Sequence, residues 1–382
     1  MVHVLAIKIL VITHEYPPIG GGGGKIIQDL SDGISSDNYL FYILTAHYED
    51  LPEIEKKEFL VIERLHTLRR EAYRASLPAM FCFVWKSFWR SLRLIRTWQP
   101  DLIHAHFAVP GGASAALASI LTRTPLILTI HGGDVPGGAP QKTDRWFQFI
   151  KPFSGFIWKH ATKIIAVSED SRQLALSHYH VEIAVIPNGI DRKPFDQNNS
   201  NPHKPPHILF VGRFSPEKNA TAIPEILKDL LAYEWVCTMI GDGPQLGQLK
   251  ERIQKYNLNQ RIHLEGWLQQ EEVNQILCKG DILILPSLRE SMPMVGLQAL
   301  AAGNALVMSD VGACPEMVDV EKNGYLIEPG NIEGFTQAVE HLLASPDKLA
   351  GFKEHSKTLS IKFDIQTVLE NYRSAYQDVL KS

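Results

Sequence analysis

The feature that most constrains this chain is an alternation of short, β-branched strand patterns with longer helical segments. One series of strand patterns comprises IKILVIT (7–13), LFYILT (40–45), DLIHAHF (101–107), PLILTIH (125–131) and KIIAVS (163–168). A second series comprises HILFVGR (207–213), WVCTMIG (235–241), RIHLEG (261–266), DILILPS (281–287) and NALVMSD (304–310). Nearly continuous apolar strands between helices are typical of parallel sheets that helices cover on both faces.

Two such series in 382 residues predict an α/β protein with two Rossmann-like, doubly wound parallel-sheet domains. We expect the N-terminal domain over residues 1–190 and the C-terminal domain over 205–363. The polar segment 191–204 is predicted to be the linker, because its Asn, Pro and charged residues cannot form a core. Helical spacing over 364–382 predicts a terminal helix that returns to the first domain. The two domains are expected to face each other across a deep cleft.

Composition excludes several classes of protein. The formal net charge of −4 excludes a nucleic-acid binder that relies on bulk charge. The cysteines, Cys82, Cys237, Cys278 and Cys314, lie far apart, which fits a reducing compartment better than a disulfide framework. No apolar run is long enough to span a membrane. The sequence therefore predicts a cytoplasmic protein, with peripheral contact to the inner face of the plasma membrane as an open alternative.

Unusual residues follow the strands, where doubly wound sheets bind their ligands. Five glycines, Gly20 to Gly24, come after the first strand and precede a helix expected to begin near Lys25. Glycine allows close approach of the backbone, and a helix N-terminus attracts phosphate. The alternative is a flexible loop without a ligand.

Two cations follow the first strand of the second series. Arg213 ends that strand, and Lys218 lies five residues later, near the next helix. Fixed positive charges stabilise a departing diphosphate as its charge develops. The alternative is a pair of solvated side chains on a surface turn.

His131 also ends a strand, in the motif HGGD, where Asp134 is expected to hold the loop. A buried histidine satisfied by a backbone carbonyl is the alternative. Glu290 follows another strand end, and the next helix is expected to begin near Pro293. The free N–H groups near Met294 and Val295 would form an anion site, although a surface glutamate at a helix start is also common.

Taken in order, these motifs resemble glycosyltransferase family 4, whose fold is GT-B. The resemblance spans residues 15–330 and rests on EYPPIGGGGG, HGGD, VSED, IPNGID, VGRFSPEKN, IGDGP, EGW, RESMPMVGLQALAAG and DVGACPEMV. It implies a retaining, metal-independent transfer of a sugar from a nucleotide diphosphate sugar.

The resemblance also implies roles for individual residues. Arg213 and Lys218 match the pair that binds the diphosphate, and His131 matches the histidine beside the donor sugar. Glu290 matches the first glutamate of a Glu-x7-Glu signature, which contacts the sugar hydroxyls. The residues that match donor-binding positions are Gly20, Gly21, Gly22, Gly23, Gly24, Gly212, Gly241, Gly243, Trp267, Leu268, Ser291, Met292, Pro293, Met294, Val295 and Gln298.

One position departs from the signature. The second glutamate, which grips the ribose diol in relatives, is Gln298 here. A neutral amide loses the charge-assisted strength of a carboxylate, so we expect a weaker grip on the nucleotide. The chain also has no Asp-x-Asp, a spacing often used to hold a nucleotide sugar through a metal, so neither a metal nor a cofactor is expected.

Residues 64–98 hold eight basic side chains and one acidic one. Within them, Phe81, Val84, Trp85, Phe88, Leu92 and Ile95 follow helical spacing, which predicts a basic amphipathic helix. Such a helix either packs on the N-terminal sheet with a solvated basic face or contacts an anionic membrane.

We therefore expect a hexosyltransferase of bacterial exopolysaccharide or glycolipid synthesis. UDP-glucose is the first expectation for the donor, GDP-mannose is its rival, and the acceptor would be a saccharide or a lipid-linked sugar. A nucleotide-sugar epimerase of the same fold and a non-catalytic sugar-nucleotide binder remain alternatives. A dinucleotide oxidoreductase is disfavoured, because the strand at 40–45 ends in Thr45-Ala46 rather than in an acidic residue.

Overall fold

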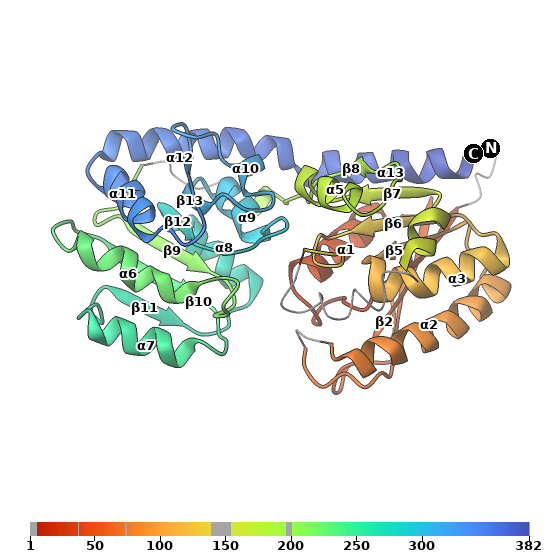
Figure 1. Cartoon of the computed structure of the whole chain (residues 1–382). Coiled ribbons are helices and arrows are strands. Elements are labelled where there is room, and N and C mark those ends of the chain that lie inside the picture. Colours follow the sequence, from red (N-terminus) through yellow and green to blue (C-terminus); the bar gives the residue numbers. More distant parts are fainter. Residues whose placement is uncertain (1–5, 37, 73–74, 139–153, 196–200, 382) are drawn as a thin grey trace. The chain divides into compact units, whose positions relative to one another are not determined.

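The computed structural model describes residues 6–36, 38–72, 75–138, 154–195 and 201–381. The chain divides into two compact units (Figure 1). Unit 1 comprises Met1–Asn188 and Thr367–Ser382, and unit 2 comprises Gly189–Gln366. Each unit is built on a sheet of its own.

The sheet of unit 1 has the strand order β3-β4-β2-β1-β5-β6-β7-β8. Its strands are β1 (Ile7–Ile12), β2 (Tyr39–Ala46), β3 (Ile54–Lys56), β4 (Leu60–Leu65), β5 (Leu102–His106), β6 (Leu126–Ile130), β7 (Lys163–Ala166) and β8 (Ala184–Val185). All neighbours pair in parallel except β3, which is antiparallel to β4. The chain steps outward from β1 in both directions, as in a doubly wound fold.

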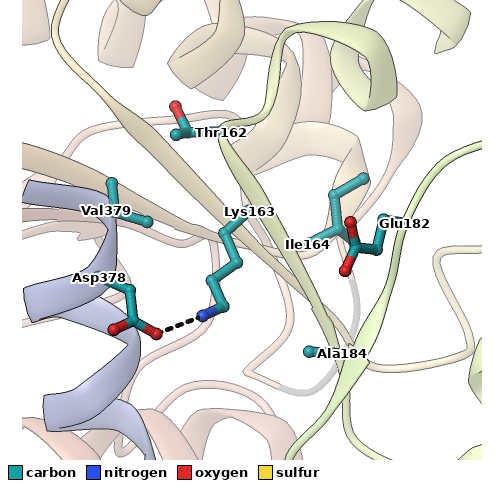
Figure 2. A pocket seen from close by; sticks show the side chains of 7 residues that line it. All are labelled: Thr162, Lys163, Ile164, Glu182, Ala184, Asp378 and Val379. Carbon is teal, nitrogen blue, oxygen red and sulfur yellow. Dashed lines mark hydrogen bonds and ion pairs between the residues drawn. The ribbon is translucent and has the colours of Figure 1, made fainter. Parts of the chain in front are cut away.

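The helices of unit 1 within the described residues include α1 (Gly22–Ile34), α2 (Leu77–Thr97), α3 (Ala113–Thr122), α5 (Glu169–Leu176) and α13 (Ile365–Lys381). The C-terminal helix α13 packs on this unit from Thr367 onward. Tyr376 lies against Phe41 of β2, and Asp378 pairs with Lys163 of β7 at 3.0 Å (Figure 2).

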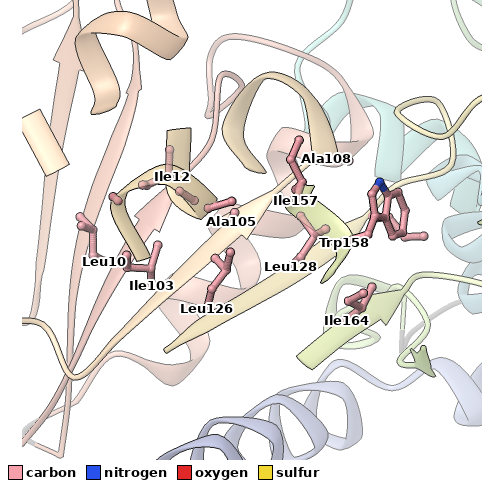
Figure 3. Packing of buried hydrophobic residues seen from close by; sticks show 14 of the residues in the cluster. Leu10, Ile12, Ile103, Ala105, Ala108, Leu126, Leu128, Ile157, Trp158 and Ile164 are labelled. Carbon is pink, nitrogen blue, oxygen red and sulfur yellow. The ribbon is translucent and has the colours of Figure 1, made fainter. Parts of the chain in front are cut away.

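The apolar strands of unit 1 are buried because both faces of the sheet are covered. Leu10 and Ile12 of β1 belong to one hydrophobic cluster, to which α2 and α3 contribute Phe83, Leu94 and Ala115. Figure 3 shows the strand residues of that cluster packed together. Ile9 and Val11, which alternate with them, are also buried, since α1 and α13 cover the opposite face.

The sheet of unit 2 has the order β11-β10-β9-β12-β13-β14, and every pairing is parallel. Its strands are β9 (His207–Val211), β10 (Val236–Ile240), β11 (Ile262–Glu265), β12 (Ile282–Leu285), β13 (Ala305–Ser309) and β14 (Gly324–Ile327). Its helices within the described residues are α6 (Ile223–Leu227), α7 (Leu246–Lys255), α8 (Gln270–Cys278), α9 (Met294–Ala302), α10 (Cys314–Met317), α11 (Ile332–Leu343) and α12 (Pro346–Ser360). Two parallel-sheet α/β units confirm the predicted fold class.

All ten predicted strands are present, but sequence patterning missed β3, β4, β8 and β14. In β4, Glu63 and Arg64 interrupt the apolar run. Glu63 pairs with Arg90 of α2 and Arg64 with Glu55 of β3. Because these partners lie outside β4, the local sequence pattern did not indicate a strand there.

Two helix predictions need correction. The helix predicted near Lys25 begins at Gly22, so three of the five glycines lie inside α1. In α2, the predicted apolar stripe is only partly confirmed: Phe88, Leu92 and Ile95 pack against the core, whereas Phe81 and Trp85 are exposed. The buried positions are Ala79, Phe83, Ser87, Ser91 and Leu94. Small residues occupy this face because α2 packs closely on α3, where Ser87 donates a 2.9 Å hydrogen bond to Ser114.

Residues 196–200 of the predicted linker lie outside the described residues. The chain beside them is attached to unit 2, with Phe195 buried. The carboxylate of Asp281, itself buried, accepts hydrogen bonds from the backbone of His203 at 3.2 Å and from Lys353 at 2.5 Å. A segment too polar to form a core is thus held by a buried ion pair.

Candidate active site

The predicted site residues fall into two groups, one in each unit. In unit 2 they lie in the loops that follow β9, β10, β11 and β12, at the carboxyl ends of these strands. Gly212 and Arg213 follow β9, and the side chain of Lys218 passes beside Gly212. A Cβ at Gly212 would lie 4.0 Å from Cδ of Lys218, so the two predicted cations belong to one short loop.

Glycines hold two of these loops together. Gly241 and Gly243 follow β10 and have φ angles of +141° and +157°. A Cβ at Gly241 would lie 2.0 Å from the carbonyl oxygen of Gly212, and one at Gly243 would lie 2.4 Å from that of Phe214. Only glycine permits this close backbone contact, which fixes the loop that carries Arg213 and Lys218.

Lys218 and Glu290 form an ion pair in which Nζ of Lys218 lies 2.6 and 2.7 Å from the two carboxylate oxygens. The hydroxyl of Ser287 donates to the same carboxylate at 2.7 Å. The Glu290 side chain is only 5% exposed, whereas that of Lys218 is 29% exposed. The Lys218 side chain is thus more open to solvent than the carboxylate with which it pairs.

The helix α9 begins at Met294, four residues after Glu290. Pro293 is the N-cap residue and no side chain caps the first turn, so the N–H groups near Met294 and Val295 can receive an anion. Ser291 is held by the backbone of Ala313, whose N–H donates to its carbonyl at 2.7 Å. Gln298 lies in the second turn of α9 and is buried, as is Met292.

The loop after β11 joins the same edge of the sheet. The N–H of Gly241 lies 3.1 Å from the carbonyl oxygens of both Glu265 and Gly266. Trp267 comes next and is 71% exposed, whereas Leu268 is half-buried. The structure thus brings all of the predicted residues of unit 2 into four adjoining loops and the start of α9.

The second group surrounds the glycine loop of unit 1. Gly20 has φ of +95°, and a Cβ there would meet Glu15 at 2.6 Å. A Cβ at Gly23 would lie 2.8 Å from the ring of Phe107 and 3.8 Å from Nδ1 of His131. His131, directly after β6, therefore faces the first turn of α1 across Gly23.

His131 is buried in a cluster of aromatic rings and other histidines. Its Nε2 lies 3.2 Å from Nδ1 of His106, and its ring packs 4.4 Å from that of Phe107. Burial lowers the pKa of His131 to about 3, so the ring is neutral at pH 7. A neutral imidazole can orient a hydroxyl group, but it adds no positive charge to the site.

Asp134 holds the loop, as expected. Its two carboxylate oxygens accept backbone N–H groups, from His131 at 2.9 Å and from Ala108 at 2.5 Å. Burial nevertheless raises its pKa to about 6. Asp134 therefore positions His131 through the backbone.

Sequence reasoning missed several neighbours of the predicted residues, namely His14, His106, Phe107 and Ser287. A signal existed for His106. His104 and His106 alternate along β5, so they share one face, and β5 pairs with the strand that ends before His131. No comparable signal marked Ser287, whose role depends on the conformation of the loop after β12.

One cavity of about 250 Å³ lies at the β7–β8 edge of unit 1, beneath α13 (Figure 2). Its Lys163 is paired with Asp378, and Glu182 adds a second carboxylate. This lining does not suit a phosphate. Among the described residues, no group of three or more His, Cys, Asp or Glu side chains is arranged to hold a metal. No helix in this part of the chain is long and apolar enough to cross a bilayer.

Comparisons with known proteins agree with this architecture. Residues 20–193 match the model of Glycosyltransferase Family 4, and residues 191–359 match that of Glycosyl transferases group 1. The chain is 26% identical to an uncharacterised glycosyltransferase of Methanocaldococcus jannaschii, over 98% of this chain and 99% of the relative.

Two further proteins are informative. The UDP-Gal:α-D-GlcNAc-diphosphoundecaprenol α-1,3-galactosyltransferase of Escherichia coli is 27% identical over 66% of this chain and 69% of its own length. The crystal structure of Anabaena HepE in complex with UDP-glucose superposes with a TM-score of 0.76 at 19% identity, covering 97% of this chain and 100% of that one. Since the two family models together match residues 20–359 and both units have the parallel sheets of GT-B glycosyltransferases, the chain belongs to glycosyltransferase family 4.

Proposed function

We propose that this protein transfers a hexose, with UDP-glucose as the first candidate donor, to a saccharide or lipid-linked acceptor. The observation that carries the proposal is the group formed by Arg213, Lys218, Glu290 and the uncapped N-terminus of α9. This group combines cations and backbone N–H groups suited to a diphosphate with a carboxylate suited to sugar hydroxyls.

In the proposed reaction, the bond between C1 of the sugar and the diphosphate oxygen breaks, and its electron pair leaves with the diphosphate. Arg213, Lys218 and the start of α9 stabilise the charge that develops there. The acceptor hydroxyl oxygen bonds to C1 on the same face of the ring, and its proton passes to the leaving phosphate oxygen. The anomeric configuration is retained, and no divalent metal takes part.

The pairing of Lys218 with Glu290 suggests how the site receives its donor. The ammonium group has three N–H donors, so it can share them between Glu290 and a phosphate oxygen. Glu290, held by Ser287, then accepts hydrogen bonds from the sugar hydroxyls. We assign His131 to a further contact with the sugar, and Gln298 to the ribose.

Two relatives support the substrate classes. HepE binds UDP-glucose, and the galactosyltransferase acts on a diphosphoundecaprenol acceptor. By analogy we propose a UDP-hexose donor and a role in polysaccharide or glycolipid assembly. Contact with an anionic membrane through residues 64–98 would suit a lipid-linked acceptor.

A donor screen tests the proposal. Purified protein is incubated in EDTA with UDP-glucose, UDP-galactose or GDP-mannose, with and without a membrane extract, and nucleoside diphosphate release is measured. We expect release from a UDP-hexose that increases when acceptor is present, and a product whose anomeric configuration by NMR matches that of the donor. A free sugar epimer formed from the donor alone would instead indicate an epimerase, and an inverted product would contradict retention.

A further inference from the structure

The outer side of α2 carries large aromatic side chains where a solvated helix would carry polar ones. Phe81 and Trp85 are each 65% exposed and Trp89 is 54% exposed. They are spaced four residues apart, so they form one stripe along the helix. The inner side of the same helix contains Ser87 and Ser91. The exposed side of α2 is thus more apolar than we expect for a helix side that contacts only water.

The neighbouring helix continues this apolar surface. α3 lies beside α2 (Figure 1) and is joined to it by the Ser87–Ser114 hydrogen bond. Its small residues face α2 and the sheet, whereas Leu117, Ile120 and Leu121 are exposed. We call the outer side of the two helices, formed by Phe81, Trp85, Trp89, Leu117, Ile120 and Leu121, the α2–α3 surface.

Cations border the α2–α3 surface. Lys86, Arg93 and Arg96 are exposed on α2. At 100° per residue, Lys86 and Arg93 lie beside the aromatic stripe on the flank away from α3, and Arg96 continues the line of the stripe about two turns beyond Trp89. Residues 77–97 contain no Asp or Glu. Glu63, an acidic neighbour from β4, is already paired with Arg90.

We propose that the α2–α3 surface binds the headgroup region of an anionic lipid bilayer. Tryptophan rings favour the boundary between water and hydrocarbon, and lysine and arginine side chains extend from there to lipid phosphates. A second copy of the chain is a poorer occupant. A symmetric dimer would set this surface against the same surface of the copy, so that two equally basic borders would face each other.

Vesicle sedimentation tests this proposal, and it requires neither donor nor turnover, so its result is independent of the proposed reaction. The wild-type protein is mixed with vesicles of phosphatidylglycerol and phosphatidylcholine in equal parts, or of phosphatidylcholine alone. We expect binding to the anionic vesicles that weakens as salt is added.

Two double variants test whether the α2–α3 surface is the part of the protein that binds the vesicles. Trp85→Ser with Trp89→Ser should weaken binding to anionic vesicles by about tenfold or more, because it removes the apolar contact. Arg93→Glu with Arg96→Glu should lose roughly 25-fold per position, because each exchange changes the charge by two units and each unit near an anionic surface is worth about fivefold. The controls are Leu231→Ser, which removes an exposed apolar side chain of unit 2, and Lys250→Glu with Lys322→Glu, which makes the same charge change there. Both should bind as wild type does.

Three results would overturn the proposal. One is a wild-type protein that stays in the supernatant with anionic vesicles, and another is a tryptophan variant, folded by circular dichroism, that binds as wild type does. The third is a wild-type dimer in solution that the tryptophan variant converts to a monomer, since the α2–α3 surface would then be an interface between copies.

Discussion

Lys218 has two roles, one in the structure and one in the proposed reaction. In the structure its ammonium group neutralises the nearly buried Glu290, and in the proposed reaction it also stabilises the departing diphosphate. The first role concerns stability and the second concerns the transition state. Substituting Lys218 can separate the two roles. If the variant is shown to be folded, a change in its turnover reports only the role in the transition state.

Replacing Lys218 with Ala should lower kcat by about 10²–10³, by analogy with losing one oxyanion donor, which costs about 2.7–4 kcal/mol. Nucleotide release under saturating donor measures the effect, and a melting curve verifies the fold. Lys250→Ala, which removes an exposed lysine of α7, is the matched control and should turn over normally. Full turnover by the Lys218→Ala protein would contradict the assignment.

Gln298 is the residue at which this chain departs from the family signature. Gln298→Glu should strengthen UDP binding about fivefold, near 1 kcal/mol, because a carboxylate accepts a ribose hydroxyl more strongly than an amide does. Titration calorimetry measures the affinity, with Gln248→Glu on α7 as the control. Unchanged affinity would show that position 298 does not contact the nucleotide. Tight binding without turnover in both proteins would favour the non-catalytic alternative.

At the level of elements, the five glycines form the start of α1 as well as the loop before it. Gly21 is the N-cap residue of α1, and Gly22 to Gly24 form its first turn. The space beside each glycine differs. A Cβ at Gly21 meets nothing within 4 Å, whereas one at Gly23 meets the ring of Phe107 at 2.8 Å.

Gly23 provides a test of this contact. Gly23→Ala should displace Phe107 and with it His131, lowering kcat/KM at least tenfold, or about 1.4 kcal/mol. The control is Gly247→Ala on α7, where an added Cβ meets nothing within 4 Å, so kcat/KM should stay almost unchanged. Steady-state kinetics with the same donor give kcat/KM for both variants. Equal activities would mean that the contact between α1 and the His131 cluster plays no part in the reaction.

Periodicity located most elements of this fold, yet it did not determine how each one faces its neighbours. The stripe from Phe81 to Ile95 correctly predicted a helix. Part of that stripe packs against the core, but the most buried side of the helix is centred on Phe83 and Leu94, and contact with α3 requires small side chains at Ser87 and Ser91. That requirement comes from another helix, so the α2 sequence alone does not contain it.

The same distinction applies to the candidate site. Arg213, Lys218, Glu290 and His131 stood out because each follows a strand, which is a local property. The ion pair of Lys218 with Glu290 joins residues 72 positions apart, and its geometry depends on backbone contacts at Gly241 and Gly312. Residue types could therefore be predicted, whereas their partners required the tertiary structure.

At the scale of the whole molecule, unit 1 encloses an unusual number of neutral histidines. Burial lowers the pKa of His14 to about 4 and those of His104 and His131 to about 3, and it holds the pKa of His106 well below its usual value. Unfolded, each would titrate near 6.5. The unfolded chain therefore binds more protons than the folded protein below that pH.

This difference predicts acid sensitivity. Stability should be lost as the pH falls from about 6.5 toward the folded pKa values, by about 1.4 kcal/mol per pH unit for each histidine. Asp134 opposes the trend between its usual pKa and about 6, since its neutral form is favoured in the fold, but it is one group against four.

Urea unfolding at pH 7.5 and pH 5.5 measures the effect. His14→Phe should reduce the pH dependence, because Nδ1 of His14 has no hydrogen-bond partner among the described residues and its ring already packs on Phe83 and Phe107. His263→Asn, which removes an exposed histidine of unit 2, is the control. Equal stability at the two pH values would show that the buried histidines are protonated in the folded protein.

The central claim is that Arg213 and Lys218 of unit 2 neutralise the diphosphate of a nucleotide sugar. A crystal structure of the complex with UDP, grown with EDTA, tests it most directly. We expect the diphosphate at the N-terminus of α9, with Nζ of Lys218 and the Arg213 guanidinium about 3 Å from phosphate oxygens. A nucleotide bound elsewhere while both side chains point into solvent would contradict the claim. So would a complex that forms only when a divalent ion bridges the two phosphates.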